Sequence, residues 1–264
     1  MRAFTVLFLL AAAAACAEAA VDAHDLRPIE DKNRREPPQP RRRLAKGGLR
    51  FKQVAKLQMA GVTRYRSVVS IALGEKYAAV SVGGYIYGKV HVFERNGANS
   101  WTPSSEIGGE GTDYHFFGTS LAIKDNFLFI GSTSDDDNGN QAGAVLVYRN
   151  NNNGWEEQGK LYSSKRGNKQ RFGQSMAVDG NFLVVGAPYD KNTATGDAYV
   201  FRFNGSAWAY HSVITAPDLK NADRYGTSVA IDGNTILVGS PKEDNGRATP
   251  GPYTFIVFWA ESGS

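Results

Sequence analysis

Hydrophobic and polar residues alternate along most of this chain with the short period of β-strands. Runs such as "SMAV" (Ser175–Val178) and "FLVVGA" (Phe182–Ala187) flank the pair Asp179-Gly180. An Asp-Gly pair between two apolar runs indicates a hairpin, because the tight turn needs the positive φ that glycine adopts easily. No helical period accompanies these runs, so the pattern predicts an all-β protein.

Two further strands follow each predicted hairpin. The third strand begins at a glycine, in "GKVHVF" from Gly88, "GAVLVY" from Gly143 and "GDAYVF" from Gly196. The fourth strand begins at a tryptophan and has an aliphatic residue six positions later. These pairs are Trp101 with Ile107, Trp155 with Leu161, and Trp208 with Ile214. Each unit therefore contains four antiparallel strands.

The unit recurs, and an aromatic residue marks the start of each copy. The four aromatics are Tyr65, Phe117, Phe172 and Tyr225, with spacings of 52, 55 and 53 residues. Repeated units of four antiparallel strands are typical of a β-propeller, and we expect about four blades in residues 51–264. The aromatic would fill the space between adjacent sheets, and the recurring glycines would allow close backbone approach.

The two ends of this region are complementary. The fourth copy stops after its third strand, Tyr253–Phe258, whereas residues 51–59 begin with "FKQVAKL", which resembles a fourth strand. We expect this N-terminal strand to complete the last sheet and close the ring, which would remove an exposed edge. The first copy has Arg66 where the others have glycine. Either the ring is irregular at its seam, or the chain is part of a larger ring.

The first fifty residues differ from the rest. Residues 1–20 have an apolar run and small residues typical of a secretion signal peptide. Cys16, the single cysteine, lies there, so we expect no disulfide in the mature chain; lipid attachment at Cys16 is the alternative. Residues 21–50 are basic and Pro-rich, which predicts a disordered leader. Its "RRRL" segment (Arg41–Leu44) is a solvated linker, a processing site or a polyanion-binding arm.

Charge narrows the class of partner. The formal net charge is +4, but residues 51–264 hold 20 Lys and Arg against 20 Asp and Glu, so the excess lies in the first fifty residues. A neutral body excludes the usual basis for nucleic-acid binding. No segment after the signal is apolar enough to span a membrane. We therefore expect a secreted, extracellular protein whose partner is a protein or a glycan.

The repeated motif resembles the FG-GAP repeat, which forms the seven-bladed propeller head of integrin α subunits. Phe172-Gly173 with Gly186-Ala187-Pro188 matches both halves of that name. Tyr225-Gly226 with Gly239-Ser240-Pro241 is a conservative match, and Phe117-Gly118 with Gly131-Ser132 is a partial one. The resemblance implies extracellular recognition or adhesion, with a ligand on the upper loops. It usually implies calcium-binding loops as well.

The sequence departs from the family at those calcium loops. The corresponding positions hold only Lys124–Asn126, Asp179–Asn181 and Asp232–Asn234, which are too short to supply six or more oxygen ligands. We expect a calcium-independent variant without a cofactor. Asp135, Asp137 and Asn138 have the spacing of a different hard-cation site, although a solvated turn is the favoured interpretation of that loop.

Candidate ligand-binding residues come from the loops between strands. The acidic loops between second and third strands should share one face with the connections from fourth to first strands, and binding residues often lie on such loops. The candidates are Asp135, Asp137, Asp190, Asp244, His115, Arg171 and Arg224. Each arginine precedes a blade aromatic, and packing of its stem over that ring is the favoured interpretation of its role.

The sequence contains little that indicates an enzyme. The four histidines, His24, His91, His115 and His211, form no catalytic or metal-binding pattern. We therefore expect a non-enzymatic module. An exported hydrolase or lyase with a site at the mouth of the ring is one alternative, and a partial propeller that completes its ring by oligomerisation is another. A monomer and a homo-oligomer both remain open. The sequon "NGS" at Asn204 predicts an N-glycan in a eukaryotic host.

Overall fold

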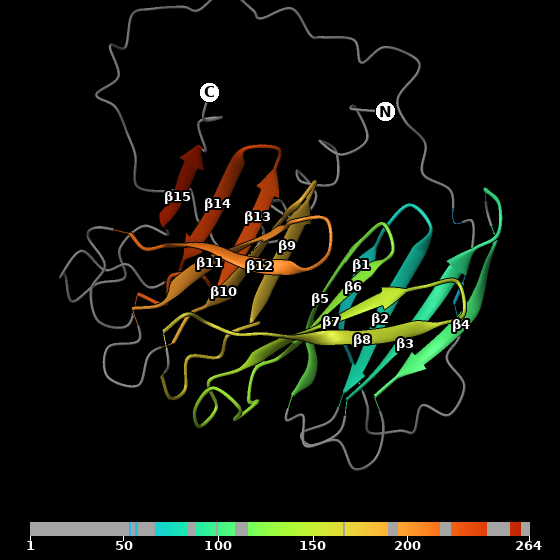
Figure 1. Ribbon diagram of the computed structural model, residues 1–264, viewed down its shortest axis with the longest axis horizontal. Coiled ribbons are helices and arrows are strands. Elements are labelled where there is room, and N and C mark those ends of the chain that lie inside the picture. Colours follow the sequence, from blue (N-terminus) through green and yellow to red (C-terminus); the bar gives the residue numbers. More distant parts are fainter. Residues whose placement is uncertain are drawn as a thin grey trace, which may run out of the picture. The chain divides into compact units, whose positions relative to one another are not determined.

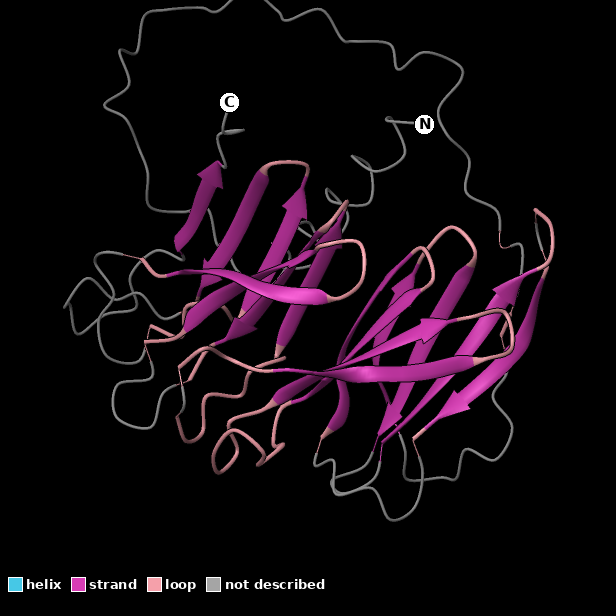
Figure 2. Ribbon diagram, viewed as in Figure 1, coloured by secondary structure: helices cyan, strands magenta, loops and turns pink. Residues whose placement is uncertain are grey.

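Antiparallel β-sheets account for every regular element that the structure describes (Figure 2). The structure is a computed structural model. It describes residues 53, 56–57, 67–83, 88–98, 100–108, 116–165, 167–189, 195–216, 223–241 and 254–259. The chain divides into two units, Met1–Gln53 and Val54–Ser264. The signal segment 1–20 and the leader 21–50 lie outside the described residues and stay predictions.

The strands form four sheets, each from consecutive strands (Figure 1). The first sheet contains β1 (Ser67–Leu73), β2 (Tyr77–Gly83), β3 (Gly88–Arg95) and β4 (Trp101–Ile107). The second contains β5 (Phe117–Lys124), β6 (Phe127–Ser132), β7 (Ala144–Asn150) and β8 (Trp155–Leu161). The third contains β9 (Ser175–Asp179), β10 (Phe182–Ala187), β11 (Asp197–Phe203) and β12 (Trp208–Ile214). The fourth contains β13 (Ser228–Asp232), β14 (Thr235–Ser240) and β15 (Thr254–Trp259).

This arrangement confirms the predicted fold class. Each four-stranded sheet follows a simple meander, and neighbouring strands are antiparallel throughout. Figure 1 shows the sheets following one another in chain order, from the first sheet (β1–β4) to the fourth (β13–β15). Consecutive meanders of this kind are the blades of a β-propeller.

Apolar cores lie between consecutive sheets. One buried cluster joins the first and second sheets, another joins the second and third, and the third joins the third and fourth. Phe172 is fully buried in the middle cluster, where its ring contacts those of Tyr199 and Phe201 edge-on. The recurring aromatic therefore fills the space between sheets, as the sequence predicts.

The same aromatic residue also fixes the backbone of one sheet to that of the preceding one. The amide of Phe172 donates to the carbonyl of Ala142 at 2.8 Å. Ala142 precedes Gly143, and a Cβ on Gly143 would collide with the Phe172 backbone. The fourth sheet repeats the bond, from the Tyr225 amide to the Thr195 carbonyl at 2.7 Å. The glycine before the third strand is therefore required by close backbone approach.

The hairpin turns differ by one position from the prediction. Asp179 pairs with Phe182, so Gly180 and Asn181 are the central residues in place of Asp179 and Gly180. Gly180 has a φ of 52°, and Asn181 is not among the positive-φ residues. Positive φ at the first centre alone fits a type II′ turn with glycine first, rather than type I′.

Closure of the ring is not shown. The fourth sheet has three strands in the described part of the chain. Of residues 51–59, only Gln53, Lys56 and Leu57 are described, and none of them is in a strand. Pairing of this segment with the last sheet stays a prediction.

Candidate functional site

Four connections lie together at one end of the blades, and we call this end the loop face. They are the β6–β7, β8–β9, β10–β11 and β12–β13 connections, whose described parts are residues 133–143, 162–165, 167–174, 188–189, 195–196, 215–216 and 223–227. Hydrogen bonds join each connection to the next. The sequence-based expectation that acidic loops and fourth-to-first connections share a face agrees with these contacts.

The bonds between the first two connections involve side-chain amides. Asn138 Nδ2 donates to the Ser163 carbonyl at 3.1 Å, and the Asn140 amide donates to Asn168 Oδ1 at 3.1 Å. The Lys169 amide also donates to the Asn140 carbonyl at 2.8 Å. These contacts hold the β6–β7 connection against the start of the next blade.

Asp197 joins the remaining connections. Lys165 Nζ lies 2.8 Å from Asp197 Oδ2, and the Thr215 hydroxyl donates to Asp197 Oδ1 at 2.8 Å. At the start of the β10–β11 connection, the Tyr189 amide donates to the Gln170 carbonyl at 3.2 Å. The loop face is therefore a bonded surface rather than a set of independent loops.

Two of the predicted ligand-binding residues meet at this face. The Arg171 guanidinium lies over the ring of Tyr189, with 4.4 Å between its Cζ and the ring centroid. The Arg224 guanidinium lies over the same ring at 5.0 Å. The sequence predicts stacking on the following blade aromatic, but both guanidinium groups lie over a tyrosine from the intervening β10–β11 connection. This geometry gathers two positive charges at one place.

The backbone of both arginines is in the left-handed region. Arg171 has a φ of 53° and Arg224 a φ of 56°, and Phe116 occupies the equivalent position of the second blade with a φ of 58°. This conformation is uncommon for residues other than glycine and costs on the order of 1–2 kcal/mol each. Amide donation from Gln174 to the Arg171 carbonyl and from Thr227 to the Arg224 carbonyl stabilises it.

Neither guanidinium group has a carboxylate partner among the described residues. The ion pairs of that part of the chain involve lysines or His91, and none includes Arg171 or Arg224. The Nε atom of Arg224 is buried and donates no hydrogen bond to any of the described residues. Within the described residues these two arginines therefore have no anionic partner, and a guanidinium group can donate bidentately to a carboxylate or sulfate.

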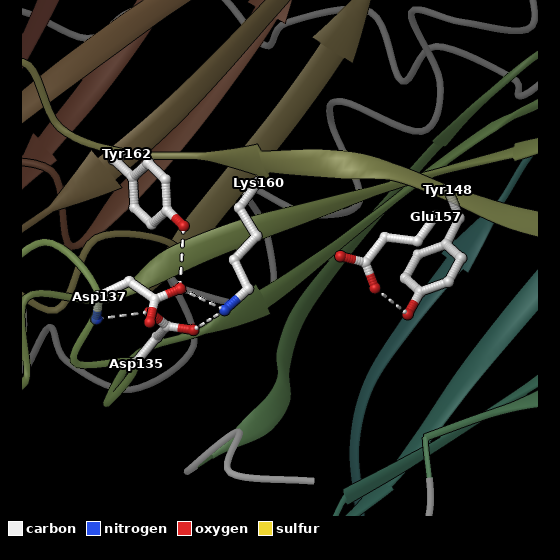
Figure 3. Close-up of polar contacts among 6 residues, drawn as sticks. All are labelled: Asp135, Asp137, Tyr148, Glu157, Lys160 and Tyr162. Atoms are coloured by element: carbon white, nitrogen blue, oxygen red, sulfur yellow. Dashed lines mark hydrogen bonds and ion pairs between the residues drawn. The ribbon is translucent and has the colours of Figure 1, made fainter.

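A second cluster on the loop face contains the predicted carboxylates Asp135 and Asp137 (Figure 3). Lys160, from β8, places its ammonium group between them, with 2.8 Å to Asp135 Oδ2 and 2.6 Å to Asp137 Oδ2. The hydroxyl of Tyr162 donates to Asp137 Oδ2 at 3.0 Å. Figure 3 also shows a separate bond from the Tyr148 hydroxyl to Glu157 Oε2, at 3.1 Å.

The two carboxylates have different surroundings. Asp135 is 3% exposed and Asp137 is 57% exposed. The hydrogen bond from Lys160, followed by that from Tyr162, lowers the pKa of Asp137 below its ordinary value of 3.8. Burial, followed by the bond to Asp137, raises the pKa of Tyr162 to about 12. Tyr162 therefore stays protonated and Asp137 ionised across the neutral pH range.

Lys160 occupies the position that the sequence considers for a metal ion. Its ammonium group already supplies the cation between Asp135 and Asp137, and Asn138 directs its side-chain amide to Ser163. Among the described residues, no group of three or more His, Cys, Asp or Glu side chains is close enough to hold a metal. Metal binding by this loop is untested, so the expectation that the chain has no cofactor stays a prediction.

Three predicted site residues, His115, Asp190 and Asp244, lie outside the described residues. The sequon residue Asn204 lies in the β11–β12 turn, where it is exposed. Its Oδ1 accepts hydrogen bonds from the amides of Ser206 and Ala207. Glycosylation of Asn204 stays a prediction.

Sequence reasoning missed Tyr189, Lys160 and Tyr162. Tyr189 follows Pro188 of the "GAP" motif. It lies in the sequence between Arg171 and Arg224, and this position could have suggested that both arginines contact it. Lys160 and Tyr162 flank Leu161, the aliphatic residue that marks the end of the predicted fourth strand. Because successive side chains of a strand point to opposite faces, Lys160 and Tyr162 both lie on the face opposite Leu161.

Comparison with known families gives one match. The model of the FG-GAP repeat matches residues 107–148, 155–201 and 208–255, which together make up more than half of the chain. The first segment begins at the end of β4, the other two begin at the first residue of β8 and of β12, and each ends within the third strand of the following blade. A search of curated proteins finds no relative. Among the described residues, no helix has the length and apolar character needed to cross a bilayer.

Proposed function

Because this chain belongs to the FG-GAP repeat family, we propose that it is a secreted, non-enzymatic recognition module that binds an acidic extracellular protein or glycan on its loop face. Propellers of this family are typically recognition modules and typically extracellular. The observation that carries the proposal is the pair of guanidinium groups over Tyr189.

The chemistry of this pair favours an anionic ligand. Arg171 and Arg224 have no carboxylate partner among the described residues, and both have left-handed backbones. The same backbone conformation at Phe116 shows that it recurs with the repeat, so it is the two guanidinium groups that favour a ligand here. A carboxylate or sulfate group beside Tyr189 would accept hydrogen bonds from both arginines.

Binding to an array of acidic and neutral glycans and of extracellular matrix proteins tests the proposal. We expect retention of acidic members, and weaker retention as salt rises, because exposed charges are screened. The variant with both Arg171→Gln and Arg224→Gln should lose roughly ten-fold or more in affinity, since each charge-assisted hydrogen bond contributes about 1.5 kcal/mol or more.

Arg202→Gln is the matched control. Arg202 lies over the ring of Phe182 at 5.7 Å, near the β11–β12 turn, which is at the other end of the blade from the loop face. Its variant should bind normally. Equal binding by the double variant and the native protein would overturn the proposal. Turnover of a polysaccharide that a single carboxylate change on the loop face abolishes would instead establish the hydrolase or lyase alternative.

A further inference from the structure

The first and fourth sheets each carry half of the interface that joins neighbouring blades. This interface occurs three times within the chain, between the first and second, second and third, and third and fourth sheets. One side comes from the first strand of the later blade, where two apolar side chains pack on the earlier blade. The pairs are Leu121 with Ile123, Met176 with Val178, and Val229 with Ile231.

In the first blade, the equivalent residues are Ile71 and Leu73. Leu73 pairs with Ala78 beside the β1–β2 turn, as Ile123 pairs with Leu128 beside the β5–β6 turn. Ile71 is 72% exposed and Leu73 is 53% exposed. Ala72 between them packs in the cluster shared with the second sheet, so alternation directs Ile71 and Leu73 to the opposite face.

The other side of the interface includes a serine that binds the following blade. Ser120 Oγ donates to the Gly173 carbonyl at 2.6 Å, and Ser175 Oγ donates to the Gly226 carbonyl at 2.9 Å. At the first interface, Ser70 Oγ accepts a hydrogen bond from the following blade, from the Leu121 amide at 3.1 Å.

Ser228 is the equivalent serine of the fourth blade. Ser175 pairs with Gly186, and Ser228 pairs in the same way with Gly239. Ser228 is exposed and makes no side-chain hydrogen bond in the described part of the chain. In the described part of the chain, no blade packs on this side of the fourth sheet, which lies at the opposite end of the row from the first sheet (Figure 1).

We propose that a second copy of this chain docks its fourth blade on Ile71 and Leu73 of the first, and that the same contact forms a second time between the remaining faces. Two copies then form one ring of eight blades, within the usual range for propellers. A head-to-tail interface that closes gives a finite ring rather than a fibre. This contact would use the same residue positions as the three interfaces within the chain. A second copy of the chain carries the complementary side, so it is the partner that we propose.

Sedimentation equilibrium of the full chain tests this assembly. We expect a mass of two chains, and a mass of one chain for the variants Ile71→Glu and Leu73→Glu, because a carboxylate would be buried at the interface. Tyr210→Glu is the matched control. Tyr210 is 47% exposed on β12, away from this interface, so its variant should keep the mass of two chains. Circular dichroism verifies that each variant is folded; where Ile71→Glu disturbs the fold, Ile71→Ser replaces it.

A mixture of two variants distinguishes the proposed head-to-tail ring from dimers that form through other surfaces. Leu237 is half-buried and lies on the face of the fourth sheet opposite Ile236 and Val238, so Leu237→Glu should break the interface from its other side. Each variant alone has two broken interfaces in a dimer, whereas a mixture can form one intact interface. We expect the mixture to regain the mass of two chains at high concentration.

Three results would overturn the proposal. The first is a native protein with the mass of one chain at every concentration, as a ring closed within a single chain would give. The second is a native dimer that Ile71→Glu leaves intact. The third is a pair of folded single-chain variants whose mixture gains no mass.

Discussion

Lys160 connects two carboxylates of very different exposure, so its two ion pairs differ in their contribution to stability. Asp135 is 3% exposed and Asp137 is 57% exposed. Exposed ion pairs typically contribute less than about 1 kcal/mol, because water and salt screen them. Removing one partner of a buried pair costs about 3 kcal/mol or more, because the other charge is left buried without compensation. Asp135 therefore dominates the effect of Lys160 on stability.

Replacement of Lys160 by methionine should therefore lower the free energy of unfolding by about 3 kcal/mol, as measured by urea denaturation. Adding Asp135→Asn to the same chain should restore part of the loss, because the buried charge is then removed. Lys76→Met is the control, since Lys76 and Glu94 form an exposed pair and the change should stay within about 1 kcal/mol. Similar losses for both lysine variants would contradict the assignment.

Acid should weaken the bond between Lys160 and Asp137. The pKa of Asp137 is lowered from 3.8 in the folded chain by its bonds to Lys160 and Tyr162. A lowered folded pKa adds stability that is present above pH 3.8 and is lost as pH falls through the folded value. The stability difference between the native protein and Asp137→Asn should be constant near neutral pH and shrink below 3.8. Urea denaturation across that range measures it, and a difference that grows in acid would refute the interpretation.

The sequence identified the two carboxylates but not the cation between them. Asp135 and Asp137 stood out because their spacing is local. Lys160 reaches them only because β7 and β8 pair with Leu146 opposite Lys160. Tyr189 was missed for a similar reason, because its contacts with Arg171 and Arg224 come from the positions of three separate connections. Side-chain partners across sheets depend on register and blade packing, which a local pattern does not specify.

At the scale of strands, the glycines of the motif determine how closely two blades approach. Gly186 lies in β10, and a Cβ at this position would collide with the carbonyl oxygen of Gly226 and with Ser175 Oγ. Ser175 Oγ donates to that same carbonyl. The contact joins the third blade to the fourth, so backbone must move if the glycine is replaced.

The variant Gly186→Ala should lose about 3 kcal/mol of unfolding free energy, because overpacking in a dense core forces the backbone apart. Gly205→Ala is the comparison. Gly205 has a φ of 99°, but a Cβ there would meet no atom within 4 Å, so strain alone should cost about 1 kcal/mol. Thermal and urea unfolding of both variants measures the difference. A smaller loss for Gly186→Ala than for Gly205→Ala would show that the blades separate easily.

Strand positions were the most predictable part of the fold. The tryptophan and the aliphatic residue six positions later marked β4, β8 and β12 at both ends. The third strands were also found, although two of them begin one residue after the expected glycine, at Ala144 and Asp197. The turn centres were displaced by one, because the aspartate pairs within the ladder. Periodicity identifies strands well, but turn type depends on which residues the register leaves unpaired.

At the scale of the whole molecule, repetition in the sequence predicted the order of the blades but not the state of the ring. Each interface inside the chain reuses the same apolar positions of the motif. The exposure of Ile71 and of Ser228 was not predictable from the motif, because both residues match positions that are buried or bonded in the other blades. The motif does not specify whether a neighbouring blade covers the outer faces of the first and fourth blades.

Removal of calcium should leave the whole molecule unchanged. In the three described hairpins where the family carries its calcium loop, the turn has two central residues and too few oxygen atoms for calcium. The other candidate carboxylates, Asp135 and Asp137, already bind the ammonium group of Lys160. A bound ion that stabilised only the folded state would raise the melting temperature with its concentration. We therefore expect the same melting temperature by scanning calorimetry in excess chelator and in excess calcium.

The variant Lys160→Met serves as the comparison, because it frees both carboxylates and should gain a calcium dependence if the lysine is what excludes the ion. A large fall in the melting temperature of the native protein on chelation would show that calcium is bound elsewhere on the blades.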